Sequence, residues 1–308
     1  MSAEEVATQL IDSKPESDPK RIAKDLFSGT MAGVAQVLTG MPFDTTKVRL
    51  VEGNYSGPIE VIKQLLKNEG ILGFYKGTLT PLVGIGACVS IQFGVNEFMK
   101  RFFSSYHAKK GLAPNTPLSS MEYYLCGGAA GLANGLLASP IELIRIKLQI
   151  QTGNINTKQF NGPLDCFKKI YQKNGTRGIF KGIFPTLIRE GHGIGIYFMT
   201  FEALIKNDMV KNNISRKEIP SWKLCLFGAT AGYSMWCTAY PIDVIKTKLQ
   251  SDNLNNPKYK TSLHVIKDIY KTTGYRGFFK GFVPTLLRAA PANAITFQVF
   301  ELTMRLLD

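Results

Sequence analysis

Arginine and glutamate interrupt two stretches of this sequence that otherwise carry no charge. Arg189 and Glu190 lie within residues 182–201, and Arg288 lies within residues 281–300. Ionisable side chains in such long apolar segments are costly and are usually functional. An arginine fork can hold a carboxylate in a bidentate pair, and a glutamate beside it can hold an ammonium group. These three residues therefore predict a binding site for an amino acid or a similar zwitterion.

The predicted site is asymmetric, although the pattern around it repeats. Arg189 and Arg288 occupy equivalent positions of the repeat, and the first copy has Gly84 there. His192 follows Arg189 by one helical turn and could contact the solute or sense protons, because histidine titrates near neutral pH. Two simpler interpretations stay open: His192 is a buried spectator, and Arg189 and Glu190 only neutralise each other.

A second pattern places an acid and a base behind a proline, and it occurs three times. The copies are Pro42 with Asp44 and Lys47, Pro140 with Glu142 and Arg145, and Pro241 with Asp243 and Lys246. Proline removes a backbone hydrogen bond and bends a helix, and residues three apart share a helix face. In a ring of three such helices, each acid meets the base of the next helix. We expect a gate made by the pairs Asp44 with Arg145, Glu142 with Lys246, and Asp243 with Lys47; the alternative is three exposed pairs, each within one helix.

Long helices must position these residues, and the sequence supplies six candidates. Two are the stretches that contain Arg189 and Arg288, and four more carry no charge, at 26–43, 77–96, 123–141 and 224–242. About 20 helical residues cross a bilayer core of roughly 30 Å. GxxxG pairs, which let helix backbones approach closely, occur at Gly29 and Gly33, Gly127 and Gly131, and Gly228 and Gly232. The predicted fold class is an all-α membrane protein with six transmembrane helices.

The connection inside each pair of helices repeats as well. It ends with EGILGFYKG at Gly77, NGTRGIFKG at Gly182 and TGYRGFFKG at Gly281. Each connection carries a short amphipathic stretch, near 58–68, 163–173 and 262–272, which is expected to lie flat on the membrane surface. We therefore predict a flexible N-terminal extension at 1–21 and three tandem repeats, at 22–110, 111–214 and 215–308.

Charge sets the expected orientation and narrows the class of function. Lys and Arg outnumber Asp and Glu by 37 to 23, which gives +14 at pH 7, and the loops 151–181 and 251–280 are strongly basic. Basic loops stay in the negative compartment, so both termini are expected on the opposite side. A soluble nucleic-acid-binding protein is the alternative, but zinc-finger spacing, a leucine zipper and an aromatic RNA-binding signature are all missing from the sequence.

Catalytic and metal chemistry have little support in the sequence. The five cysteines form no close pair and the three histidines are scattered, so we expect no metal site and no cofactor. A membrane enzyme would need a nucleophile next to a base, and the six apolar stretches offer none. The chain is therefore predicted not to be an enzyme. Its expected partner is a small-molecule solute and not a nucleic acid.

The repeated motifs resemble those of the mitochondrial carriers, whose signature is Px[DE]xx[KR]x[KR]xQ followed by [DE]Gxxxx[YWF][KR]G, three times. The resemblance extends over roughly residues 22 to 307. It implies six tilted helices around a central cavity with pseudo-threefold symmetry, and solute transport by alternating access. It also implies a multi-pass protein of the mitochondrial inner membrane that functions as a monomer, with both termini toward the intermembrane space and the proline-linked gate on the matrix side.

The resemblance also assigns roles at both gates. In the family, a glutamine nine residues after each proline braces the matrix gate; Gln149 and Gln250 match, and the first repeat has Val51. The residues that match the second, cytosolic gate are Glu97, Lys100, Glu202 and Glu301. Of these, Lys100 with Glu202 is the clearest pair. One bridge is a weak gate, which implies a resting state open toward the cytosol.

A lipid partner is implied in the same way. Gly77, Gly182 and Gly281 precede the second helix of each repeat, where free backbone N–H groups can bind phosphate. The resemblance names cardiolipin as the ligand there. The alternative is that the three glycines only begin helices.

The solute is narrowed by the residues around the two arginines. An arginine followed by an acid resembles the family branch that carries amino acids and acylcarnitine, whereas nucleotide carriers have Gly and an aliphatic residue. The sequences TLIREGHGIGIYFMTFE and RAAPANA are similar to that branch. Carnitine carriers have His before the first proline, and this chain has Met41. We expect exchange of a glutamate-like, glycine or basic amino acid, as in the fungal carriers, with carnitine or acylcarnitine as the alternative.

Overall fold

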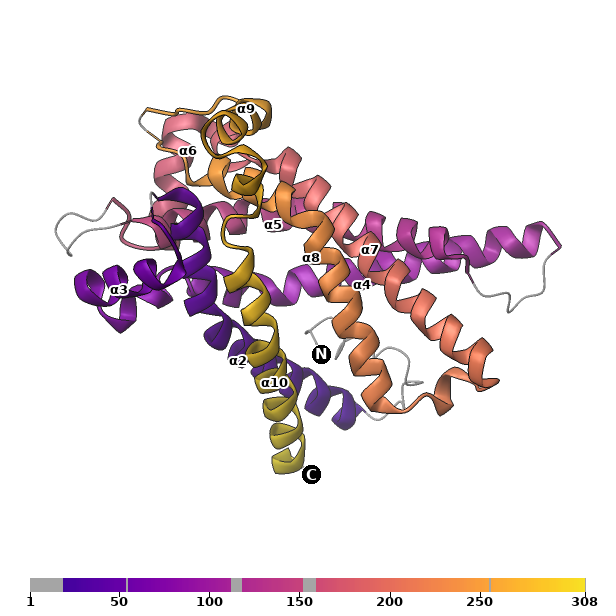
Figure 1. Ribbon diagram of the computed structural model, residues 1–308. Coiled ribbons are helices and arrows are strands. Elements are labelled where there is room, and N and C mark those ends of the chain that lie inside the picture. Colours follow the sequence, from indigo (N-terminus) through magenta and orange to yellow (C-terminus); the bar gives the residue numbers. More distant parts are fainter. Residues whose placement is uncertain (1–18, 54, 112–117, 152–158, 255, 308) are drawn as a thin grey trace. The chain divides into compact units, whose positions relative to one another are not determined.

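Helices make up the regular structure in the described part of the chain (Figure 1). The computed structural model describes residues 19–53, 55–111, 118–151, 159–254 and 256–307, and no strand occurs among them. The long helices are α2 (Pro19–Glu52), α4 (Leu79–Lys109), α5 (Ser120–Ile150), α7 (Ile183–Asn212), α8 (Ser221–Ser251) and α10 (Phe282–Leu307). The short ones are α3 (Pro58–Glu69), α6 (Pro163–Ile179) and α9 (Ser262–Thr273), with 3-10 turns η1 (Ile71–Tyr75), η2 (Arg216–Glu218) and η3 (Gly274–Phe279). The prediction of an all-α fold is confirmed for these residues.

The prolines of the repeated motif lie inside long helices. Pro42, Pro140 and Pro241 interrupt the backbone hydrogen bonds of α2, α5 and α8, yet each helix continues for several residues beyond its proline. In α2, the hydroxyl of Thr46 donates a 2.7 Å hydrogen bond to the carbonyl oxygen of Pro42. The acid and base of each motif therefore keep a helical register.

Length and composition give different answers about membrane crossing. The long helices range from 26 residues in α10 to 34 residues in α2. By apolar composition, no helix among the described residues qualifies singly as a membrane span. Residues 71–84 and 86–109, bent by 47° from each other, qualify together as one broken span. The arrangement with six spans stays a prediction at this level.

The chain divides into two compact units, and each unit draws residues from all three predicted repeats. The first unit contains residues up to Gly86, Ser139–Gly182 and residues from Val244 onward. The second contains Ala87–Ala138 and Ile183–Asp243. The division falls close to Pro140 and Pro241. The repeat boundaries stay predictions, since they describe sequence periodicity and not compactness.

The first unit is held together by apolar contacts between long and short helices. Helix α2 packs along α10, so the first and last of the described helices lie side by side (Figure 1). Each short helix contains a pair of buried side chains one turn apart, which are Val61 and Leu65 in α3, Cys166 and Ile170 in α6, and Val265 and Ile269 in α9. The pair in α6 joins a core with Leu143, Ile144 and Leu148 of α5. This i, i+4 spacing is the apolar stripe that makes each connection helical.

The second unit is organised by a close crossing of α5 and α7. A Cβ on Gly131 would lie 2.3 Å from the backbone oxygen of Glu190, and one on Gly127 would lie 2.7 Å from that of Ile194. The two backbones are thus in direct contact, as the GxxxG spacing predicts for this pair. At Gly29 and Gly232 of the other two pairs, a Cβ would meet nothing within 4 Å.

Replacing Gly131 by Ala is expected to force α5 and α7 apart. The obstacle is a backbone oxygen that cannot rotate away, so we expect a loss of about 1–3 kcal/mol in stability and a melting temperature lowered by several degrees. Gly232→Ala is the matched control, because it adds the same methyl group to a helix with open space around it. Thermal unfolding of both purified variants checks this; equal melting temperatures would contradict the close crossing.

Candidate functional site

Asp44 of α2 binds two arginines in the first unit. Arg145 of α5 donates from Nη2 to Asp44 Oδ2 at 2.5 Å, and Arg288 of α10 donates from Nη1 to Asp44 Oδ1 at 3.0 Å. The Asp44 side chain is 17% exposed, so the three groups are partly shielded from solvent. Arg288 lies over Gly40, where a Cβ would approach its Nε to 3.0 Å. The structure thus joins a predicted gate pair to a predicted solute-binding arginine, and we name these three residues the Asp44 cluster.

Arg189 and Glu190 are buried in the second unit, with 6% and 7% of their surfaces exposed. They form an ion pair with each other, and Arg189 Nε also lies 3.6 Å from Asp243 of α8. Asn134 of α5 donates from Nδ2 to Glu190 Oε2 at 3.2 Å. Isolated charges are not stable at such burial, and pairing with hydrogen bonding compensates for it. The sequence did not single out Asn134, because one amide in an apolar stretch carries no distinctive signal.

The two predicted solute-binding arginines follow one rule of contact. Arg189, on the second helix of repeat two, reaches the acid Asp243 of repeat three; Arg288, in repeat three, reaches the acid Asp44 of repeat one. The equivalent residue of repeat one, Gly84, also faces the following repeat. A Cβ there would lie 2.8 Å from Ile141 of α5, which is next to the acid of repeat two. Glycine at position 84 therefore allows its helix to pack directly against α5.

The predicted matrix gate is partly assembled within the first unit. Lys246 of α8 forms an ion pair with Glu142 of α5, in addition to the Arg145 pair of Asp44. The third predicted pair, Asp243 with Lys47, joins residues of different units and stays a prediction. Asp243 and Lys47 are both buried, at 4% and 8% exposed.

The glutamines that follow the gate are buried and have different partners. Gln149 donates from Nε2 to the hydroxyl of Thr45, beside Asp44, at 3.3 Å. Gln250 donates from Nε2 to the carbonyl oxygen of Lys181 at 3.4 Å. Val51, which replaces the first glutamine, is buried at 3% exposed. A brace on the gate is thus geometrically available to Gln149, and its function stays a prediction.

A lysine before each repeated glycine binds the end of the next repeat's first helix. Lys76 donates to the carbonyl oxygen of Gln151 at 3.0 Å, and Lys280 donates to that of Gly53 at 2.8 Å. Lys181 forms a 2.8 Å ion pair with Asp252, just past α8. A cation stabilises the carboxyl end of a helix, where backbone carbonyls are unpaired. Sequence reasoning missed this role, although the constant spacing of the three lysines was visible.

Further ion pairs join the long helices α2 and α8 to the short helices that follow them, α3 and α9. Arg49 donates to both carboxylate oxygens of Glu69 at 2.6 and 2.9 Å, and Lys76 contacts the same carboxylate at 2.6 Å. In repeat three, Lys248 lies 3.5 Å from Asp268 of α9. Tyr259 donates its hydroxyl to Asp268 at 2.5 Å and Lys258 lies 3.0 Å from it. These bonds, the one from Tyr259 above all, lower the pKa of Asp268 to about 2.

The lowered pKa of Asp268 predicts the pH range in which this carboxylate stops stabilising the fold. A carboxylate with a depressed pKa stabilises the fold above its ordinary pKa near 4, and this contribution disappears as the pH falls toward about 2. Asp268→Asn should therefore melt at a lower temperature than the parent protein at pH 7, and the gap should close between pH 4 and pH 2. Tyr259→Phe should move the closing of this gap to higher pH. A gap of equal size at pH 7 and pH 2 would contradict the assignment.

The glycines predicted to bind cardiolipin have a structural role of their own. Gly77, Gly182 and Gly281 have φ angles of 82°, 86° and 86°, in the region that favours glycine. A Cβ on Gly77 would lie 3.0 Å from the backbone oxygen of Arg145, and one on Gly182 would lie 2.7 Å from Gln250. Backbone geometry and packing thus account for glycine here, and phosphate binding stays a prediction.

The residues of the predicted cytosolic gate each form an ion pair. Lys100 lies 3.1 Å from Glu97 on the same helix, and Glu202 pairs with Arg216 of η2 at 3.0 Å. Glu301 pairs with Arg305 one turn later on α10. Lys100 and Glu202 thus each have an ion-pair partner besides the one predicted. The bridge between them stays a prediction for a state in which this end is closed.

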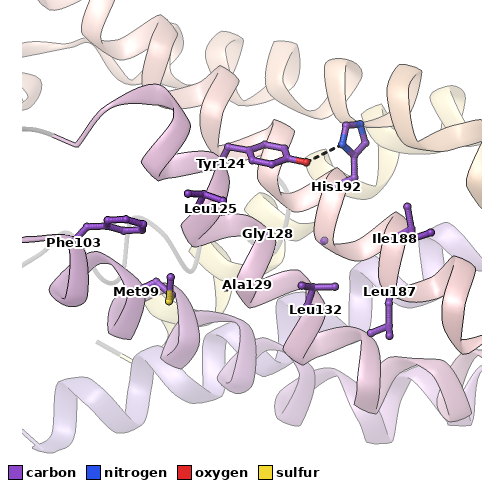
Figure 2. Close-up of a pocket in the computed structure, with 11 residues that line it drawn as sticks. Met99, Phe103, Tyr124, Leu125, Gly128, Ala129, Leu132, Leu187, Ile188 and His192 are labelled. Carbon is purple, nitrogen blue, oxygen red and sulfur yellow. Dashed lines mark hydrogen bonds between the residues drawn. The ribbon is translucent and has the colours of Figure 1, made fainter. Parts of the chain in front are cut away.

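His192 lies beside an apolar pocket of about 460 Å³ in the second unit. Side chains of α4, α5 and α7 line this pocket, and Figure 2 shows Tyr124 and His192 directed toward each other at its edge. The Tyr124 hydroxyl and His192 Nδ1 are 3.1 Å apart. A solute contact by His192 stays a prediction, since its visible partner is a protein side chain. Among the described residues, no group of three or more His, Cys, Asp or Glu could hold a metal ion.

Comparison with known proteins supplies an independent line of observation. A family model described as mitochondrial carrier protein matches residues 18–107, 116–211 and 217–308. A mitochondrial glycine transporter of Saccharomyces cerevisiae is 52% identical over 313 aligned positions, which cover 100% of both chains. A glutamate/glycine mitochondrial carrier of Schizosaccharomyces pombe is 49% identical, over 93% of this chain and 95% of its own. A mitochondrial basic amino acids transporter of Homo sapiens is 36% identical, over 92% and 90%.

Proposed function

Because the chain belongs to the mitochondrial carrier family, we propose that it exchanges an amino acid across the mitochondrial inner membrane by alternating access. Members of this family are transporters, and the chain is not expected to perform covalent chemistry. The long helices fit this proposal, since even 26 residues extend about 39 Å at 1.5 Å each, against a bilayer core of roughly 30 Å. In the proposed arrangement, α2, α4, α5, α7, α8 and α10 cross the membrane as three repeats.

The buried pair of Arg189 and Glu190 carries the proposal of an amino acid. Both charges required to hold a zwitterion lie next to each other at about 6–7% exposure, and buried charges in a membrane segment usually mark the solute path. Relatives named as glycine and glutamate carriers are about half identical to this chain over nearly their whole length. We infer glycine and glutamate as the first solutes to test, with a basic amino acid next, and Arg288, Gly84 and His192 as further parts of the solute site.

The gates and the lipid complete the proposed transport cycle. Ion pairs of Asp44, Glu142 and Asp243 with Arg145, Lys246 and Lys47 would close the matrix side, with Gln149 and Gln250 as braces. Ion pairs of Glu97, Lys100, Glu202 and Glu301 would close the cytosolic side. Ion pairs suit a gate because partly hydrated charges can exchange partners at low cost. Cardiolipin at Gly77, Gly182 and Gly281, a functional monomer and termini toward the intermembrane space belong to the same proposal.

Uptake by reconstituted protein tests the proposed function. Liposomes that contain the purified chain and are loaded with unlabelled solute should take up labelled glycine, glutamate or ornithine faster than protein-free liposomes. Carnitine and ATP serve as solutes of other classes. Uptake of an amino acid supports the proposal, whereas exchange of carnitine or ATP without any amino acid would overturn it.

A further inference from the structure

Asp44 connects two parts of the proposed mechanism that were assigned separately. Its Oδ2 accepts from the gate residue Arg145 at 2.5 Å, and its Oδ1 accepts from the solute-site residue Arg288 at 3.0 Å. The Arg288 side chain is 31% exposed, so its remaining donors are accessible to a small molecule. A guanidinium has five N–H donors but pairs best with one carboxylate at a time in the bidentate geometry.

We propose that the carboxylate of the solute competes with Asp44 for Arg288, and that this competition links solute binding to the release of the matrix gate. The inference rests on the proposed function, because it requires a carboxylate-bearing solute. Asp44 is in this view a specificity-determining residue. Its carboxylate pairs with Arg288 until the carboxylate of a bound solute replaces it. A solute that has no carboxylate cannot displace it.

The energetic reason lies in the sharing of one acid by two bases. While Arg288 holds Oδ1, Asp44 is oriented so that Oδ2 faces Arg145, and both arginines hold the carboxylate in place. When a solute carboxylate takes Arg288, Asp44 keeps one arginine in a partly solvated site, and such a single pair contributes little to stability. The gate pair is then weaker than before the solute bound. A ligand shifts a conformational equilibrium only by such a differential interaction.

A second arginine also lies near the gate acid of the following repeat. Arg189 Nε lies 3.6 Å from Asp243, the gate acid of repeat three. Both solute-site arginines therefore engage the gate acid of the following repeat. This recurrence makes an accidental contact of Arg288 a poor explanation. The experiment below uses the Asp44 cluster, in which all three partners lie within one compact unit.

Two substitutions separate competition at Arg288 from simple loss of the gate. Asp44→Asn and Arg145→Gln both remove the pair between Asp44 and Arg145. Asp44→Asn also removes the carboxylate that pairs with Arg288. Arg145→Gln keeps this carboxylate, which can then pair with Arg288 without competition from Arg145. We expect Asp44→Asn to bind glycine about three- to tenfold more tightly than the parent protein, and Arg145→Gln to bind it about threefold more weakly. Asp165→Asn removes one carboxylate from an exposed pair with Lys169 on α6 and is the control for net charge.

Binding is measured as the rise in melting temperature that glycine causes in the purified protein, since a ligand that binds the folded state stabilises it in proportion to RT ln(1 + [L]/Kd). Glycinamide, which lacks the carboxylate, is the matched probe. Opposite changes in glycine affinity for Asp44→Asn and Arg145→Gln, with no gain for glycinamide, support the proposal. Arg145→Gln gives a test by itself if Asp44→Asn does not fold.

Three results would overturn the proposal. Affinity for glycine could change in the same direction in both variants, or remain unchanged in folded Asp44→Asn. Glycinamide could also gain as much affinity as glycine, which would indicate a general effect of charge. If the parent protein shows no shift with glycine, glutamate or ornithine, the proposed amino-acid function itself fails, and the inference fails with it.

Discussion

Uptake of glycine and glutamate is expected to fall to the level of protein-free liposomes when Arg189 or Arg288 is replaced by Ala. Each arginine supplies charge-assisted hydrogen bonds, which contribute about 1.5–3 kcal/mol apiece. Loss of two such bonds to one carboxylate corresponds to a decrease of about a hundredfold or more in affinity. Arg189→Ala also leaves Glu190, which is 7% exposed, without the arginine that neutralises it. Initial rates of labelled uptake measure the effect.

Folding must be separated from transport in these variants. Removing one member of a buried ion pair destabilises a protein by about 3–5 kcal/mol, so Arg189→Ala could lose activity by unfolding. The double variant Arg189→Gln with Glu190→Gln removes both charges of the pair and retains polar side chains, and it is expected to fold and not to transport. Lys169→Ala, in an exposed pair on α6, is the control for loss of a base. Normal uptake by either arginine variant would reject the proposed solute site.

Reversing the charges of the pair between Glu142 and Lys246 is expected to give the second large effect. Glu142→Lys or Lys246→Glu places like charges together at a site where Lys246 is 3% exposed, and we expect at least a tenfold loss of transport from each. The double variant restores opposite charges and should recover most of that loss. Equal activity in the single and double variants would exclude an ion-pair gate.

Charge reversal in a second ion pair shows whether the loss of transport is specific to Glu142 and Lys246. Lys169 and Asp165 form an exposed i, i+4 pair on α6, where charge reversal costs only a few tenths of a kcal/mol. Neither single reversal there should change transport. A large loss from those reversals would mean that the loop charge, and not a gate, controls the rate.

Repetition made the cross-helix pairs predictable from the sequence. Glu142 and Lys246 are far apart in the chain, yet a threefold motif on bent helices leaves few ways to satisfy three acids and three bases. The same logic covers the close crossing at Gly131, since the spacing of small residues indicates where two backbones can meet. The ion pairs follow from the repeated motif and the crossing from helical register, although a Cβ at Gly29 or Gly232 of the other two glycine pairs would meet nothing within 4 Å.

Contacts that depend on the path of a long side chain could not be predicted in this way. The contact of Arg288 with Asp44 depends on how a long flexible side chain runs over Gly40, and only the structure shows that Arg189 makes a corresponding contact with Asp243. At the other end, Lys100 meets Glu97 at 3.1 Å because residues three apart on a helix are always neighbours. Such a local pair competes with any long-range bridge in a given conformational state. Contacts of long side chains therefore require a structure, whereas pairs fixed by a repeated motif can be inferred from the sequence.

Exchange of glycine, compared with its two truncated analogues, tests the central claim most directly. Acetate lacks the ammonium group and methylamine lacks the carboxylate, so each keeps one of the two charges that the site is proposed to hold. Liposomes containing the protein should exchange labelled glycine against internal glycine and should exchange neither analogue above the protein-free rate. Equal exchange of glycine and an analogue, or no exchange of glycine, glutamate or ornithine, would contradict a site that selects an amino acid by both of its charges.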